Sequence, residues 1–386
     1  MGKAMQQFTA GHFEDFHLLS KIQQKLNAHP RERAKLVSLY HCNRSGIKGA
    51  GRVDVIHARN SSTGACSAHF SLVSRCHSSW VCPVCAVRNF TLQSGTISKL
   101  LQCRAEQGYK AFMLTTTIPH RREQSAQELI DLLKACKRKM RGTAAYKTQK
   151  QLDINGTITA TECTYGLHGF HFHQHILFFI PAENWEEVES FAKTYKSCWE
   201  RAFTAVTGVP YDATKTNQYN PTESVYLSRT KRGAVLNVTD GKYVCDFGRE
   251  LAKCQSWEHR AVRGRSMFEL ANSDDPRDFD LFLEYALATK GYARIVYSNK
   301  LRREADQYYE LEKKTVDANI EKRVEATFYT SDWCSICESE IDTAKHHRYE
   351  ILQACLDGGY DSILEYCRRE NLPLPAEPLA QLAEAG

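Results

Sequence analysis

The sequence predicts an α+β fold in which an antiparallel sheet is flanked by helices. The first observation is an apolar run, Ile176–Ile180, which suits a buried strand and directly follows three histidines at alternate positions. The second is a run rich in β-branched residues, Thr157–Thr164, joined to the histidine strand by a glycine-containing turn at Tyr165–Gly169. The third is the order of elements, because further helix and strand patterns lie on both sides of this predicted hairpin.

The composition is that of an ordinary globular protein. The chain has 386 residues, of which 42% are hydrophobic and 25% are charged, which is enough for two or three folded units. No run of about 18 apolar residues occurs, so we expect no transmembrane helix and no membrane partner. Fifteen cysteines, without the apolar stretch of a signal peptide, indicate reduced thiols, metal ligation and a cytoplasmic location. The net charge of +6 is mild for a nucleic-acid-binding protein.

The first elements lead into a cysteine-rich region. Phe13–Val37 has an amphipathic helical pattern that Pro30 interrupts. Within Tyr40–Val87, Cys82 and Cys85 form a Cys-x2-Cys knuckle, which holds two thiolates at tetrahedral spacing on a tight turn.

Further ligands to the same ion are available nearby. Cys76 is the natural third ligand, and we expect Cys42 to be the fourth, with Cys66, His77 and His69 as alternatives. Four protein ligands leave no open position for water, so the region predicts a structural Zn²⁺ site.

A helix, a strand and a second helix are predicted next, over Asn89–Gln107, Tyr109–Ile118 and Ser125–Arg141. The end of the second helix and the residues after it are basic: Lys134, Lys137, Arg138, Lys139, Arg141, Lys147 and Lys150. Such a run is either a solvated face or, since Tyr146 is interleaved, a track for a nucleic-acid backbone.

The predicted hairpin carries a candidate divalent-metal site. Side chains on a strand alternate between faces, so His171, His173 and His175 share one face. The turn can bring Glu162 beside His173 and His175, and two imidazoles with a carboxylate bind divalent cations. A cluster of buried, purely structural histidines is the alternative, but it would be costly without a charge partner.

Another helix, Asn184–Val206, and two short strands, Ser224–Leu227 and Ala234–Val238, follow. Strand, helix, hairpin, helix, strand is the β-α-β-β-α-β order of a ferredoxin-like sheet. Thr239–Cys254 then reads as a helix that Asp240 could cap.

Together these segments resemble the plasmid rolling-circle replication initiators of the HUH endonuclease superfamily. Cys76–Cys85 resembles the family's "C-x-S-x-W-x-CPVC" region, and Phe112–His120 resembles "FLTLTVPH". Glu162–Leu177 resembles "E-x-T…G-W-HPHLHVL", with Gln174 where the family has a hydrophobic residue. Gly241–Val244 resembles the start of the helix that carries the catalytic tyrosine. Gly264–Arg302 is similar to the family's "GR-x-PF-x-LL", "EY…KG" and "I-x-WS-x-GLR" motifs.

This resemblance implies an enzyme that nicks and rejoins one DNA strand at an origin. Tyr243 would be the nucleophile, helped by Mn²⁺ or Mg²⁺ on Glu162, His173 and His175. His171 would be a further ligand or would orient the phosphate. The products would be a 5′-phosphotyrosine link and a 3′-hydroxyl primer. The implied partners are origin DNA, a host helicase and a DNA polymerase.

Other residues near the implied nucleophile could take part. The resembling family often has a lysine after the tyrosine, where this sequence has Asp246, and Lys242 could take the place of that lysine. The candidate DNA contacts are Lys137, Arg138, Lys139, Arg141 and Lys242. Asp240, Asp246 and Glu250 are candidates for the acid that activates water at termination.

The sequence suggests four consecutive segments: an N-terminal helical segment over residues 1–40, a zinc-binding region over 41–100, a nuclease domain over 101–255 and a helical C-terminal region over 256–386. The last segment contains Cys334, Cys337, His346 and His347, whose spacing only partly matches that of a zinc finger. Two other functions remain open. One is a single-strand DNA transposase or relaxase with the same chemistry, although a relaxase usually carries its tyrosine before the histidines. The other is a zinc-bearing DNA-binding regulator without catalysis.

Overall fold

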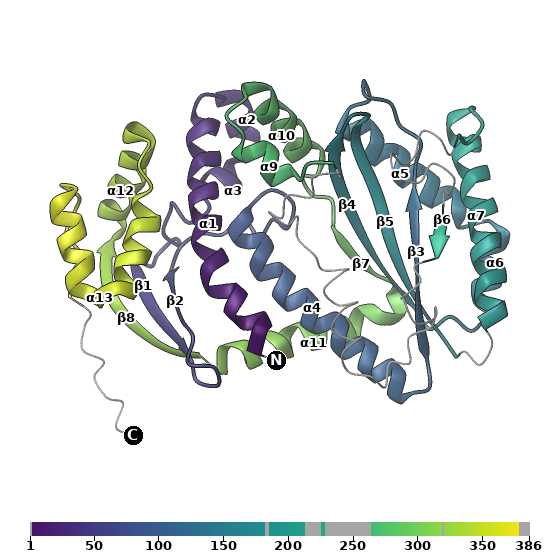
Figure 1. Cartoon of the computed structure of the whole chain (residues 1–386), viewed down its shortest axis with the longest axis horizontal. Helices are drawn as coiled ribbons and strands as arrows, with labels where there is room; N and C mark the ends of the chain where they lie inside the picture. Colours follow the sequence, from purple (N-terminus) through teal and green to yellow (C-terminus); the bar gives the residue numbers. More distant parts are fainter. Residues whose placement is uncertain (1, 182–184, 213–224, 228–263, 319, 378–386) are drawn as a thin grey trace. The chain divides into compact units, whose positions relative to one another are not determined.

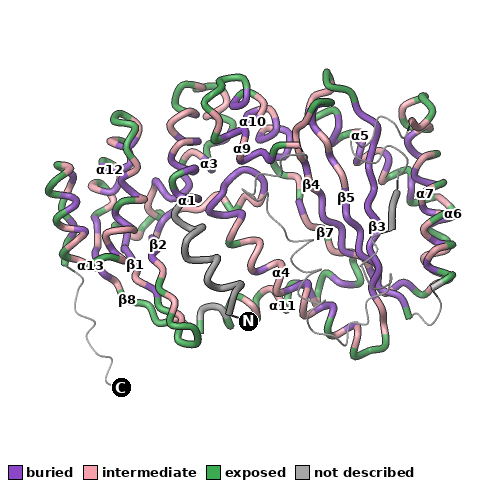
Figure 2. Tube along the Cα trace, in the orientation of Figure 1, coloured by how far each residue is buried: buried purple, intermediate pink, exposed green. Residues whose placement is uncertain are grey.

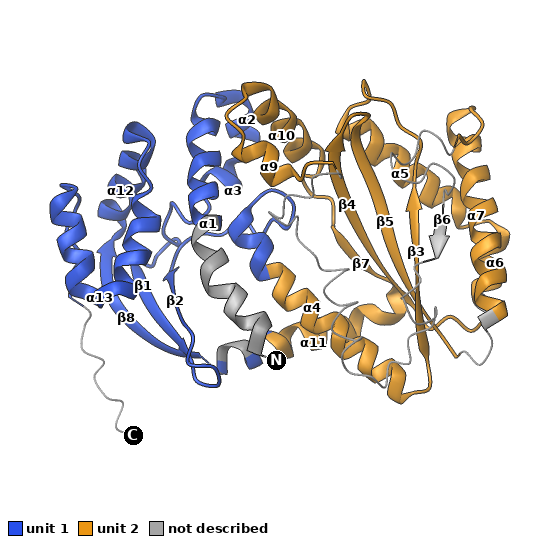
Figure 3. Ribbon diagram, viewed as in Figure 1, with its two compact units in different colours: residues 1–88, 313–386 blue, residues 89–312 orange. Residues whose placement is uncertain are grey.

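The computed structural model describes residues 2–181, 185–212, 225–227, 264–318 and 320–377 (Figure 1). The chain forms two compact units (Figure 3). Unit 1 combines residues 1–88 with residues 313–386, and unit 2 comprises residues 89–312. The four consecutive segments suggested by the sequence were defined by motifs, whereas these units are defined by compactness, so the four segments stay a prediction. Among the described helices, none has the length and apolar character needed to cross a membrane.

Unit 2 is built on a five-stranded antiparallel sheet in the order β6-β3-β5-β4-β7. The strands are β3 (Lys110–Thr117), β4 (Thr157–Gly166), β5 (Gly169–Ile180), β6 (Val225–Leu227) and β7 (Ile295–Tyr297). The predicted hairpin is confirmed, since all of β4 pairs with β5 as far as Phe178. Figure 2 shows that β3 and β5, at the centre of the sheet, are buried over most of their length.

One face of this sheet packs against helices α5 (Ala126–Met140) and α7 (Trp185–Thr207). Ser125 and Glu128 form a capping box that fixes the start of α5. Phe112 and Phe178 stack at 5.0 Å, and Phe191 of α7 meets both rings edge-on. Such aromatic contacts add to the free energy gained by burying apolar surface.

Three more helices pack around α5 and α7. They are α6 (Ala144–Gln151), α9 (Met267–Asn272) and α10 (Pro276–Ala288). α10 contacts α5 and α9, and α6 contacts α7.

Among the described residues, an apolar cluster covers one end of the other face of the sheet. There, Leu177 and Phe179 of β5 pack against Leu100 and Leu101 of α4 (Pro83–Glu106) and against Leu301 of α11 (Asn299–Ala318). Since side chains alternate along β5, His173 and His175 lie on this same face, beyond the apolar cluster.

Unit 1 holds a second antiparallel sheet in the order β2-β1-β8. Its strands are β1 (Arg52–Asn60), β2 (Cys66–Ser71) and β8 (Ile320–Tyr329). β8 corrects the prediction of a helical C-terminal region, because its alternating apolar residues pair along the full length of β1.

The helices of unit 1 come from both ends of the chain: α1 (Gly2–Asn27), α2 (Pro30–Lys35), α3 (Val37–Tyr40), α12 (Thr330–Thr343) and α13 (His347–Arg369). Pro30, which interrupts the predicted first helix, begins α2. Phe70 of β2 packs against Phe16 and Trp333.

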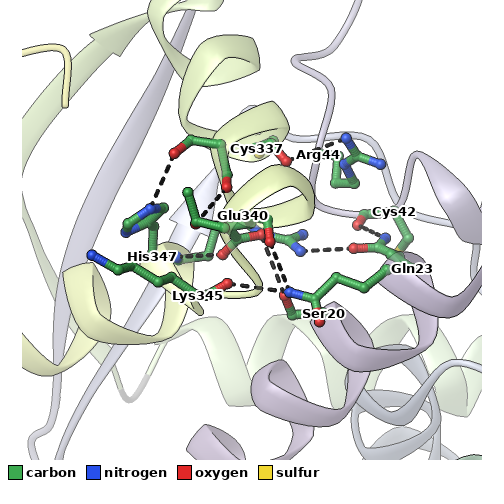
Figure 4. A network of polar contacts seen from close by, with 12 residues as sticks. Ser20, Gln23, Cys42, Arg44, Cys337, Glu340, Lys345 and His347 are labelled. Carbon is green, nitrogen blue, oxygen red and sulfur yellow. Dashed lines mark hydrogen bonds and ion pairs between the residues drawn. The ribbon is translucent and has the colours of Figure 1, made fainter. Parts of the chain in front are cut away.

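A buried polar network joins α1 to α12 and α13 (Figure 4). The Arg348 guanidinium donates to Glu340 Oε2 and to Gln23 Oε1, both at 2.7 Å. Gln23 Nε2 in turn donates to the carbonyl oxygens of Leu39 and Cys42, at 3.0 and 2.9 Å. Hydrogen bonds to Gln23 and from the Arg348 amide to Glu340 Oε1 offset part of the cost of burying this ion pair.

Candidate metal centre

The β4–β5 ladder brings a carboxylate to two imidazoles. Glu162 lies directly opposite His173 in the register, and His175 lies two residues further along the same face. Glu162 Oε2 is 3.3 Å from His173 Nε2 and 3.8 Å from His175 Nε2. One ligand atom from each residue lies within 4.8 Å of the others, so the three could hold one metal ion.

The neighbouring groups orient this trio. Thr115 Oγ1 lies 2.8 Å from His175 Nδ1, which leaves Nε2 of the same ring facing Glu162. Burial alone would raise the pKa of Glu162, but hydrogen bonds from His173 and His175 hold it well below its usual value. Glu162 is therefore an ionised carboxylate, the form that binds a cation.

A second cluster consists of sulfur ligands in unit 1. Cys42 Sγ is 3.7 Å from Cys82 Sγ and from Cys85 Sγ, and Cys76 Sγ is 3.8 Å from Cys85 Sγ. All four lie within 4.8 Å of one another, so they could hold one ion. Cys66, His69 and His77, the alternatives for the fourth ligand, do not belong to this group.

The backbone around the cysteines also suits a bound cation. The amides of Cys76 and Cys85 point at Cys42 Sγ and Cys82 Sγ, at 3.4 and 3.5 Å. Hydrogen bonds from the neighbouring thiols, Cys42 first, lower the pKa of Cys85, whereas burial raises the pKa of Cys82. An all-sulfur, four-residue set with amide donors at its sulfurs fits a closed tetrahedral metal site.

A comparison with protein families decides which family the chain belongs to. A family model described as "Replication protein", Rep_1, matches residues 69–333, which is more than half of the chain. The chain belongs to the Rep_1 family of replication proteins. The match spans Glu162, His173 and His175 and confirms the predicted resemblance to plasmid rolling-circle replication initiators, a group consistent with the HUH superfamily. No curated protein and no solved structure matches the chain.

His171 of this replication protein lies beside the trio but is not part of its metal-binding group. Its ring stacks on His173 and tilts against His120, with centroids 5.2 Å apart in both cases. Burial lowers the pKa of His171 and of His120, so both rings are neutral near pH 7.

Two residues at the site were not singled out from the sequence. His120 stands at the end of a family-like motif but had no role assigned to it. Arg294 is buried beside β4, with Nη2 3.9 Å from Glu162 Oε1. It lies in an irregular segment before β7, where no periodic pattern indicates which way a side chain points.

Of the predicted basic residues, Lys134, Lys137, Arg138 and Lys139 lie on α5, which packs on the opposite face of the sheet, Arg141 follows the end of α5, and Lys147 and Lys150 lie on α6. Lys134 Nζ lies over the Tyr292 ring, 5.2 Å from its centroid, and Gln174 Nε2 donates to the Tyr292 hydroxyl at 3.4 Å. Gln174 alternates with His173 and His175, so it points away from the trio. Burial, together with Arg141, lowers the pKa of Lys137 to about 8. Contact of Lys137, Arg138, Lys139 and Arg141 with DNA stays a prediction.

Tyr243, Lys242, Asp240, Asp246 and Glu250 lie outside the described residues, as does the predicted strand Ala234–Val238. The described residues on either side of them are fixed to the sheet. β6 pairs with β3 at Leu114–Thr116, and Arg265 exchanges two backbone hydrogen bonds with Tyr165 at the end of β4.

Cys334, Cys337, His346 and His347 in the C-terminal region do not form a metal-binding group among the described residues. His347 uses both ring nitrogens, since Nδ1 lies 2.8 Å from the Tyr366 hydroxyl and Nε2 lies 3.3 Å from Ser339 Oγ.

Proposed function

We propose that this replication protein starts rolling-circle replication by nicking one DNA strand at an origin and later rejoins it. The observation that carries the proposal is the convergence of Glu162, His173 and His175 on one face of the central strands. Membership of the replication protein family supports a role at origin DNA. The host helicase and the DNA polymerase remain proposed partners.

The sheet supports a ferredoxin-like, HUH-type core for this activity. Its first four strands stand in the order β6-β3-β5-β4, all antiparallel, with α5 between β3 and β4 and α7 between β5 and β6. This order supports the β-α-β-β-α-β arrangement that we propose for the core.

A divalent cation, when bound by the trio, supplies Lewis-acid polarisation of a non-bridging oxygen of the scissile phosphate. Two imidazoles in the ligand set favour Mn²⁺ over Mg²⁺, which prefers oxygen ligands. The Thr115 hydroxyl can accept a hydrogen bond from Nδ1–H of His175, which would leave the lone pair of Nε2 for the ion. For the cysteine cluster, four thiolates favour Zn²⁺ in a structural role.

The proposed nucleophile is Tyr243. A phenol has a pKa of about 10, so it is mostly neutral near pH 7 and a poor nucleophile unaided. A cation held by the trio would make the phosphate easier to attack. The Tyr243 oxygen bonds to phosphorus, the bond to the 3′ oxygen breaks, and the proton passes to that oxygen. A 5′-phosphotyrosine and a 3′-hydroxyl primer result, and the reverse reaction rejoins the strand. Lys242 is a proposed phosphate contact, and Asp240, Asp246 and Glu250 are candidates for activating the terminating water.

The test is a nicking assay on supercoiled plasmid that carries the origin, with Mn²⁺ present. We expect open circles with protein attached to the 5′ end, and Tyr243→Phe should abolish the adduct while retaining DNA binding. Binding without cleavage by the natural protein would instead support a non-catalytic DNA-binding regulator. An adduct that persists in Tyr243→Phe would show that another residue is the nucleophile. Cleavage of single-stranded ends with rejoining to a new target would support a transposase.

A further inference from the structure

Arg294 is a buried cation held next to the metal-binding strand. Its side chain is 6% exposed, and its backbone carbonyl accepts a 2.8 Å hydrogen bond from the amide of Thr161. The next residue, Ile295, pairs with Ala160. The backbone of Arg294 is thus fixed to β4 immediately beside Glu162.

The guanidinium faces the one carboxylate oxygen that the histidines leave unused. Glu162 Oε2 faces both imidazoles, whereas Oε1 is buried, accepts no hydrogen bond and lies 3.9 Å from Arg294 Nη2. A buried carboxylate oxygen without a donor is costly, and a small closing movement would bring it into hydrogen-bond range of the guanidinium.

We propose that Arg294 is a positioning residue for the metal ligand Glu162. It holds Oε1, so that Oε2 stays turned toward His173 and His175. This inference rests on the proposed function, because it takes the trio to be the metal site. Partners of this kind typically contribute about tenfold to a hundredfold in metal affinity.

A competing effect has the opposite sign. Arg294 also repels a divalent cation, so a residue that acted only through its charge would weaken metal binding, and its removal would tighten it. The direction of the change in Mn²⁺ affinity therefore separates positioning from simple repulsion.

The experiment measures Mn²⁺ binding to the full chain without DNA, with zinc already loaded, by titration calorimetry and by the electron paramagnetic resonance signal of free Mn²⁺. Arg294→Met keeps the length of the apolar stem and removes the charge, and we expect its affinity to fall about tenfold. Arg294→Lys keeps the charge without the planar fork and should recover part of the loss. Arg303→Met, at an exposed position of the same unit, is the matched control and should bind as the natural protein does.

A double-mutant cycle tests whether Arg294 acts through Glu162. Glu162→Asp keeps a carboxylate but moves it away from Arg294. In that background, Arg294→Met should lower Mn²⁺ affinity by less than about twofold. The same loss in both backgrounds, or unchanged or tighter binding by Arg294→Met, would overturn the positioning role alone. A natural protein that binds no Mn²⁺ through Glu162 would overturn this inference together with the proposed metal-assisted reaction.

Discussion

Thr115 and His175 are joined by a 2.8 Å contact between Oγ1 and Nδ1, across the β3–β5 ladder. The contact holds the His175 ring so that Nε2 faces Glu162. Thr115→Val keeps the shape of the side chain and removes the hydroxyl. We expect Mn²⁺ affinity to fall about tenfold or more, with a parallel loss of nicking, because the ring can then rotate or change tautomer.

The matched control for this prediction is Thr116→Val. Thr116 is buried on the opposite face of β3, and its hydroxyl has no hydrogen-bond partner. Its replacement should leave Mn²⁺ affinity unchanged. Equal affinities in Thr115→Val and the natural protein would rule out an orienting role for the hydroxyl.

The cysteine cluster predicts that zinc holds part of unit 1 together. Cys85→Ser should lower the zinc content measured by mass spectrometry and lower the thermal midpoint of unfolding, since structural zinc sites contribute directly to folding. Cys66→Ser is the control, because Cys66 is exposed and lies outside the four-sulfur group. If Cys85→Ser retained a full equivalent of zinc, the proposed ligand set would have to be revised.

The Glu340–Arg348 pair predicts a large effect on the stability of unit 1. Arg348→Met leaves the Glu340 carboxylate buried without its 2.7 Å partner, and breaking such a pair costs about 3–5 kcal/mol in the free energy of unfolding. The double change Arg348→Met with Glu340→Leu should cost clearly less, because no charge then remains buried. Urea unfolding of both variants checks this order, and a double variant less stable than the single one would contradict it.

A pair of histidines predicts how the stability of unit 1 depends on pH. The rings of His17 and His346 have centroids 3.8 Å apart, and burial, followed by the charge of His17, lowers the pKa of His346 to about 4. The unfolded pKa is about 6.5, so between these values the unfolded chain binds a proton that the folded chain does not. Stability should therefore rise as the pH increases from about 4 to about 6.5 and should be lost on acidification through this range.

His346→Gln removes this titration, so the urea midpoint should change less across the same pH range than it does in the natural protein. His168→Gln changes an exposed histidine in unit 2 and serves as the control. Parallel pH profiles for His346→Gln and the natural protein would show that another group governs the acid transition.

The sequence predicts the parts of this protein whose signals are local. The period-two histidines, the β-branched run before them and the two glycines of the turn are enough to specify the β4–β5 hairpin, including Glu162 opposite His173. The Cys-x2-Cys spacing does the same for two of the four sulfurs.

The missed features depend on pairing between residues far apart in the chain. β8 pairs with β1, which lies more than 250 residues earlier in the chain. Its charged residues Glu321, Lys322 and Arg323 directly follow a charged helix, so no local pattern marks where the helix ends and the strand begins. Arg294 reaches Glu162 only because β7 pairs with β4. The alternating apolar residues of β8 are a local signal, but no local pattern shows that β1 is their partner, and Arg294 has no periodic signal.

Gln174 gives the last prediction, because it is a polar residue that stands between the two proposed metal ligands. It is buried between Thr116 and Thr161 on the neighbouring strands, and its Nε2 donates to Thr161 Oγ1 at 3.0 Å. Its Oε1 has no donor among the described residues, and an unsatisfied buried acceptor costs about 1–3 kcal/mol, whereas Nε2 donates two hydrogen bonds, to Thr161 and Tyr292, of about 1 kcal/mol each. These contributions nearly cancel, so Gln174→Leu should change the free energy of unfolding by less than about 1 kcal/mol, whereas Gln174→Ala should lower it clearly by leaving a cavity. Urea unfolding measures both changes. Mn²⁺ affinity should stay constant in Gln174→Leu, because the residue points away from His173 and His175; a loss of affinity would mean that the two faces of β5 are coupled through its backbone.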